Sequence, residues 1–171
     1  KHMFSKTDIV NYFLSEKQES LVAIGLGGLL IISAGLLLLA GARLYRGAAW
    51  PLFLTALLLA GSGLNGYRES DRRRVEMVYA YDMNPARLKQ QELPRMQLLL
   101  RRYLLYRYMA MVFLLIGVSL YLYYRAYPAL GFWRGLGLAT ALMALLLLLL
   151  GFHTEKEAME YTRALLEFSG R

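Results

Sequence analysis

Four long runs of hydrophobic residues alternate with polar segments along the chain. The runs cover residues 21–42, 48–64, 108–124 and 129–152, and they contain no charged residue apart from Arg134 near the start of the fourth. A helix needs about 20 apolar residues to cross a hydrocarbon core of about 30 Å, so each run is long enough, or nearly so, for one span. The pattern predicts an all-α integral membrane protein with four transmembrane helices, two in residues 21–64 and two in residues 108–152.

The basic residues are unevenly distributed between the two sides of this arrangement. The N-terminal segment, the central connection and the C-terminal tail carry 16 of the 20 Lys and Arg, and all 12 Asp and Glu lie there too. The opposite side has only Arg43, Arg46, Arg125 and Arg134. Cytoplasmic loops carry an excess of Lys and Arg, so we expect both termini and the central connection in the cytoplasm. This orientation indicates a multi-pass protein of the bacterial inner membrane.

The polar segment before the first span, residues 1–20, is predicted to contain a short helix. Lys1, His2 and Met3 have the character of a cloning remnant. A helical stripe that includes Ile9 and Phe13 suggests a helix lying in the head-group boundary. Ser15, three residues before Gln18, matches a capping box and predicts that the first spanning helix begins there.

The central connection, residues 65–107, reads as a basic helical hairpin. Glu69 with Arg73 and Arg72 with Glu76 stand four residues apart, where opposite charges support a helix. The segment from Asp82 to Pro85 has turn chemistry, and a second helix should start near Ala86 or Pro94 and continue into the third span.

The C-terminal tail, residues 153–171, is predicted to form an acidic amphipathic helix. Thr154 and Glu157 match a second capping box at its start. Because the tail is acidic and the hairpin basic, we expect the two to attract each other, within one subunit or between neighbours. Reversing the charges of Glu157 and Glu160 should loosen that contact. The residues expected to contact a partner or anionic lipid head groups are Arg72, Arg73, Arg74, Arg101, Arg102, Arg107, Glu157 and Glu160.

Small residues recur within the spans at the spacing that lets helices approach closely. Those expected to pack helices together are Gly25, Gly28, Gly35, Ala56, Ala60, Gly131 and Gly135. The span interiors also contain hydroxyl groups, which commonly bond back to their own helix. They are at the same time the candidates for lining a pore, together with one boundary amide: Ser33, Thr55, Ser62, Asn65, Ser119 and Thr140.

The sequence argues against several classes of function. The spans lack ionisable groups at depth, so no catalytic residue is assigned and an enzyme is not expected. His153, Glu157 and Glu160 could be drawn as metal ligands on one helical face, but a solvated acidic helix is the preferred interpretation, and neither metal nor cofactor is assigned. Topology accounts for the basic charge, so nucleic acid is not expected as a partner.

Three functional hypotheses remain, in order of preference. The first is a non-enzymatic inner-membrane protein that self-associates as a homo-oligomer and docks a cytoplasmic or membrane partner through the basic hairpin. The second is an oligomeric ion channel gated by the hairpin. The third, an enzyme that modifies membrane lipids, lacks candidate acids, bases and nucleophiles.

Overall fold

The structure, a computed structural model, describes residues 5–84 and 88–169, with the side chains of Lys89 and Ser169 left aside. It contains four long helices: α1 (Lys6–Leu39), α2 (Arg43–Met83), α4 (Leu93–Tyr124) and α5 (Gly131–Ser169). A π-helix, η1 (Leu88–Glu92), precedes α4, and a 3-10 turn, η2 (Pro128–Leu130), precedes α5. The described residues form no strand, so the all-α prediction is confirmed. Each long helix contains a stretch apolar enough to cross a membrane, as expected of a multi-pass membrane protein.

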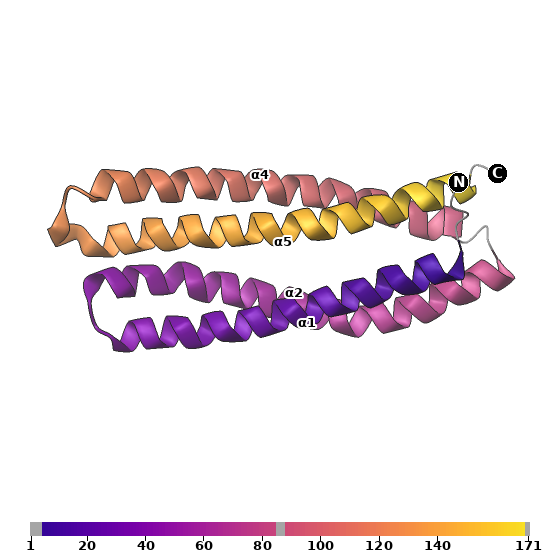
Figure 1. Cartoon of the computed structure of the whole chain (residues 1–171), viewed down its shortest axis with the longest axis horizontal. Helices are drawn as coiled ribbons and strands as arrows, with labels where there is room; N and C mark the ends of the chain where they lie inside the picture. Colours follow the sequence, from indigo (N-terminus) through magenta and orange to yellow (C-terminus); the bar gives the residue numbers. More distant parts are fainter. Residues whose placement is uncertain (1–4, 85–87, 170–171) are drawn as a thin grey trace.

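The long helices form two hairpins that lie side by side. In Figure 1, α1 pairs with α2 and α4 pairs with α5, and α2 packs along α5 to join the two pairs. In the most apolar stretches of α2 and α5, 33% and 28% of the residues are buried. In those of α1 and α4, 11% of the residues are buried. The apolar half is therefore a layer in which α2 and α5 are central and α1 and α4 are outer.

The opposite half of the molecule, which we call the polar half, consists of residues 5–20, 65–84, 88–107 and 153–168. All four long helices contribute to a hydrophobic core there, and Leu88 of η1 is also part of it. The buried members of this core are Ile9, Phe13, Met77, Ala80, Leu88, Met96, Ala158, Tyr161 and Leu165. The C-terminal part of α5 thus packs against the hairpin within one chain, mainly through apolar side chains.

Two predicted helix starts are wrong because the helices run through them. α1 begins at Lys6, where Ser5 and Asp8 form a capping box in which the Ser5 amide donates to Asp8 Oδ2 at 2.8 Å, and it passes Ser15 without a break. α5 likewise continues through Thr154, whose hydroxyl donates to the carbonyl of Leu150 at 3.2 Å. A capping-box pair inside a long helix has no free backbone amides to satisfy, so it gives no start signal.

The apolar face of the N-terminal stripe packs into the core of the polar half, whereas the prediction had it in a head-group boundary. Ile9 is 0% exposed and Phe13 is 1% exposed, because α5 and the hairpin cover them. The proposed cloning remnant, Lys1 to Met3, lies outside the described residues.

The central connection has the helical character that was expected. α2 extends to Met83 and ends at Asn84, while Pro94 lies in the first turn of α4. The Glu69–Arg73 and Arg72–Glu76 pairs both form, at 2.7 and 3.5 Å. The turn at Pro85 and a helix start at Ala86 fall outside the part of the chain that the structure describes.

Small residues lie at all three helix contacts of the layer. An added Cβ at Gly27 of α1 would meet the carbonyl oxygen of Ala56 at 3.0 Å and the Cβ of Ala60 at 3.1 Å in α2. An added Cβ at Gly117 of α4 would lie still closer, 2.5 Å, to the amide nitrogen of Ala141 in α5. Between the two hairpins, Gly135 of α5 lies directly against the carbonyl of Leu44, and Gly47 of α2 lies equally close to the carbonyl of Phe132.

The other predicted packing residues differ in their surroundings. An added Cβ at Gly131 would lie at an ordinary contact distance, 3.5 Å, from the amide nitrogen of Leu44. An added Cβ at Gly25, Gly28 or Gly35 would meet nothing within 4 Å, so these glycines face away from the neighbouring helices of the chain. Glycines occur on several faces of α1, and the sequence does not show which face meets α2.

Candidate functional site

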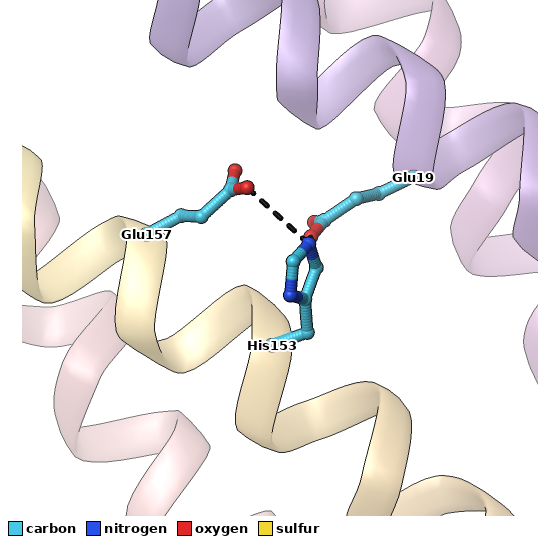
Figure 2. A group of neighbouring side chains, drawn as sticks. All are labelled: Glu19, His153 and Glu157. Carbon is cyan, nitrogen blue, oxygen red and sulfur yellow. Dashed lines mark ion pairs between the residues drawn. The ribbon is translucent and has the colours of Figure 1, made fainter.

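Three polar side chains, one from the first hairpin and two from the second, converge where the polar half begins. Figure 2 shows Glu19 of α1 facing His153 and Glu157 of α5. The Nε2 atom of His153 lies 3.3 Å from Glu157 Oε1 and 3.8 Å from Glu19 Oε1. His153 and Glu157 are four residues apart, so they lie on one face of α5, while Glu19 approaches from α1. The cluster offers one imidazole and two carboxylates to a bound species.

Glu19 is the most shielded member of this cluster. Its side chain is 23% exposed, against 70% for His153, and its Oε1 atom is buried without a hydrogen-bond partner among the described residues. Burial raises the pKa of the Glu19 carboxyl, while the hydroxyl of Thr154 and the imidazole of His153 lower it. The sequence prediction missed Glu19, because its position opposite His153 depends on how α1 packs against α5.

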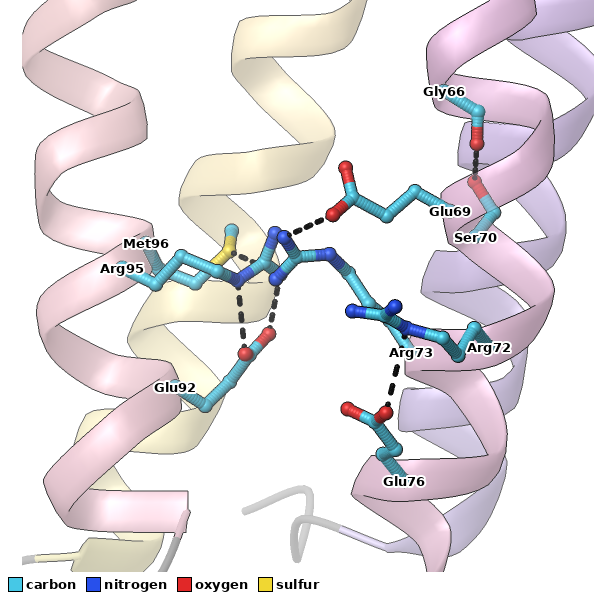
Figure 3. A network of polar contacts seen from close by, with 9 residues as sticks. All are labelled: Gly66, Glu69, Ser70, Arg72, Arg73, Glu76, Glu92, Arg95 and Met96. Atoms are coloured by element: carbon cyan, nitrogen blue, oxygen red, sulfur yellow. Dashed lines mark hydrogen bonds and ion pairs between the residues drawn. The ribbon is translucent and has the colours of Figure 1, made fainter.

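A second polar network lies deeper, between the hairpins. Figure 3 shows Arg95 of α4 donating to both carboxylate oxygens of Glu92, which is 2% exposed; the Arg95 Nε donates to Oε2 at 2.9 Å. On the facing helix, Arg73 donates to Glu69 at 2.7 Å. Neither Glu92 nor Arg95 was predicted as a site residue, although their spacing of three residues is typical of a helical ion pair. The Glu92–Arg95 and Glu69–Arg73 pairs therefore hold charged side chains inside the polar half.

Glu16 of α1 lies beside the same network without sharing in its ion pairs. Its Oε2 atom is buried without a hydrogen-bond partner among the described residues. Burial raises the pKa of the Glu16 carboxyl, and the nearby guanidinium groups of Arg95 and Arg73 only partly offset this. Folding therefore favours the protonated form of Glu16.

Comparison of a Glu16→Gln variant with the wild type should show how the raised pKa of Glu16 makes stability depend on pH. A carboxyl whose folded pKa is raised contributes stability at low pH and loses that contribution as pH rises through its folded pKa. Because glutamine does not titrate, the variant should melt with the wild type at pH 4 and a few degrees above it at pH 8. Thermal unfolding across that range measures the difference. The exposed Glu160→Gln variant is the control, and a difference for Glu16→Gln that stays constant with pH would contradict the burial argument.

The predicted basic contacts divide into paired and unpaired groups. Arg72, Arg73 and Arg74 form ion pairs with Glu76, Glu69 and Asp71 on their own helix. Arg107 pairs with Glu155 of α5 at 3.2 Å. Arg101 and Arg102 are exposed on α4 and form no ion pair with any described residue.

An acidic groove of about 770 Å³ runs between α1 and α5 in the polar half. Four carboxylates and one guanidinium line it, together with Tyr12 and Tyr161, whose rings stack at 4.2 Å. Within the described part of the chain, Glu160 and Glu167 form no ion pair. The charged residues of the groove are Asp8, Glu157, Glu160, Arg163 and Glu167.

The candidate pore-lining residues form no hydrogen bond with one another in the described part of the chain. The hydroxyls of Ser33, Ser62 and Thr140 each donate to a carbonyl one turn earlier in their own helix, at 2.7 to 2.8 Å. Thr55 is buried, whereas Asn65 and Ser119 are exposed. Three of the five hydroxyl groups are therefore satisfied within their own helices.

Comparison with known proteins gave no match. No family model fits the sequence, and neither a curated protein nor a solved structure is significantly similar to the chain.

Proposed function

We propose that this chain is a non-enzymatic scaffold of the bacterial inner membrane that self-associates through its cytoplasmic polar half. In this proposal, Arg101 and Arg102 of one copy bind the acidic groove of the next. The observation that supports it is the division of charge. Five of the eight hairpin cations with described side chains are paired within the chain, whereas Arg68, Arg101, Arg102, Glu160 and Glu167 have no ion-pair partner among the described residues.

The two surfaces lie at matching levels along the helices. The Arg107–Glu155 pair marks one level, and a second level is marked by Tyr12, which stacks on Tyr161 and donates to the sulfur of Met96 at 3.8 Å. Arg101 and Arg102 lie between these levels in α4. Glu160 lies between them in α5. Copies inserted with the same orientation would therefore present opposite charges to each other at one height.

The height of these arginines favours a protein partner over lipid. Arg102 precedes the expected start of the third span at residue 108 by six residues, which corresponds to about 9 Å of helix. Arg107 lies at the boundary, where anionic head groups are expected to add to its pairing with Glu155.

The proposed contact joins two different surfaces, so it is heterologous. Such contacts close into rings or extend into open chains, depending on the rotation between copies. Exposed ion pairs are each worth about 0–1 kcal/mol, so association should weaken as salt rises. A platform built this way could gather a further protein partner at the cytoplasmic face.

Charge reversal and complementation test the proposal. Arg101→Glu/Arg102→Glu and Glu160→Lys/Glu167→Lys variants should each be smaller than the wild type in detergent at low salt, because each sets like charges against each other. An equal mixture should recover the wild-type mass, because every contact in an alternating assembly is again complementary. Light scattering gives the mass.

The matched control is Arg72→Glu/Arg74→Glu, which makes the same charge change in the same hairpin at arginines that are paired within the chain. It should keep the wild-type mass. A wild type that is monomeric at low salt, or a mixture that fails to recover, would overturn the proposal.

A further inference from the structure

The cluster of Glu19, His153 and Glu157 has the composition and spacing of a transition-metal site. Its three ligand atoms lie within 4.8 Å of one another. Zinc binds imidazole nitrogen and carboxylate oxygen at about 2.0–2.2 Å, which places tetrahedral ligands roughly 3.4 Å apart. The His153 to Glu157 distance of 3.3 Å meets that value, and the His153 to Glu19 distance of 3.8 Å exceeds it slightly.

A second observation concerns the surroundings of Glu19. Its Oε1 atom, the one that faces His153, is shielded from solvent and has no hydrogen-bond partner among the described residues, although the hydroxyl of Thr154 lies close to the same carboxylate. Buried polar atoms in folded proteins are almost always satisfied by a partner. The carboxylate of Glu157 is also close, and it repels Glu19. A dication between the two carboxylates would satisfy the first atom and remove the repulsion.

We infer that Glu19, His153 and Glu157 bind a divalent transition-metal ion, with Zn²⁺ as the best-fitting ion, and that this ion ties α1 to α5. The three residues supply three ligands and leave a fourth position for water. The imidazole argues against Mg²⁺ and Ca²⁺, which prefer six or more oxygen ligands. Exposure of His153 gives the ion access from solvent.

The position of the site gives the ion a structural consequence. α1 and α5 belong to different hairpins, and in the polar half they otherwise meet around Tyr12 and Tyr161. A metal bridge would lock the hairpins together at the edge of the acidic groove, which Glu157 also lines. This inference concerns a single copy of the chain and does not depend on self-association.

Calorimetric titration of the full chain with ZnCl₂ tests the inference. The wild type should bind one Zn²⁺ per chain with a dissociation constant in the micromolar range or tighter, and MgCl₂ should give no binding. Glu19→Gln and His153→Asn should each weaken Zn²⁺ binding at least tenfold. The melting temperature of the wild type should rise with Zn²⁺, and that of the two variants should not.

Glu160→Gln is the matched control, since Glu160 lies one turn beyond Glu157 and outside the cluster. It should bind Zn²⁺ as the wild type does. Absence of Zn²⁺ binding in the wild type would overturn the inference, as would equal binding by Glu19→Gln and the wild type. The melting temperatures of both variants without metal show whether each one is folded.

Discussion

A Gly135→Ala variant is expected to lose about 2–3 kcal/mol of stability, or to fail to join its two hairpins. The new methyl group would overlap the carbonyl of Leu44 and approach the amide nitrogen of Ala48 at 3.2 Å. Both obstacles are backbone atoms, so relief requires α2 and α5 to move apart. Overpacking at a close contact typically costs about 1–3 kcal/mol, and backbone obstacles place this site at the upper end. Thermal unfolding in detergent measures the loss.

Gly151→Ala is the control on the same helix. An added Cβ there meets nothing within 4 Å, and alanine favours a helix over glycine by up to about 1 kcal/mol. This variant should be as stable as the wild type or slightly more stable. Equal melting temperatures for the two variants would contradict the packing of α2 against α5.

The second large effect is expected from Glu92→Gln. Glu92 is 2% exposed and holds Arg95 through two hydrogen bonds, so the substitution leaves a partly buried guanidinium without its counter-charge. Removing one partner of a buried ion pair typically costs about 3–5 kcal/mol. The free energy of unfolding should fall by an amount near the lower end of that range, because Arg95 retains 24% exposure.

Glu76→Gln provides the comparison for this effect. It breaks the Arg72–Glu76 pair, in which the side chains are 72% and 42% exposed, and such surface pairs contribute about 0–1 kcal/mol. If both glutamine variants lose the same small amount, Glu92 is not buried as described.

Hydrophobic patterning predicted the four helices because long apolar runs have few alternatives to a helix in lipid. It could not predict where the helices begin. In the sequence, the stripe at Ile9 and Phe13 resembles an interfacial helix. In the structure it packs in one core with Leu165 and Met96, which are far from it along the chain. The sequence pattern alone contains no information on that pairing.

The candidate site was foreseen only in part. His153 and Glu157 were recognised as one helical face, but Glu160 was placed with them and Glu19 was not. A ligand on the same helix can be found from its spacing, whereas one on another helix depends on how α1 and α5 are aligned. The attraction between tail and hairpin was foreseen as electrostatic. Within the chain it is mainly apolar, and Arg107–Glu155 is the ion pair that joins tail and hairpin among the described residues.

The apolar contact between tail and hairpin changes the expected effect of charge reversal in the tail. Reversing Glu157 and Glu160 should leave hydrogen-exchange protection of the tail unchanged, because neither residue pairs with a described hairpin cation and the apolar core holds α5 in place.

The most direct test of self-association through the polar half is a cysteine cross-link between copies. The chain contains no cysteine, so Arg102→Cys and Glu160→Cys single variants each carry one thiol. When the two variants are mixed in membrane vesicles and oxidised, the account predicts a mixed disulfide dimer and little dimer from either variant alone. A mixture that stays monomeric, or that yields only dimers of like variants, would contradict it.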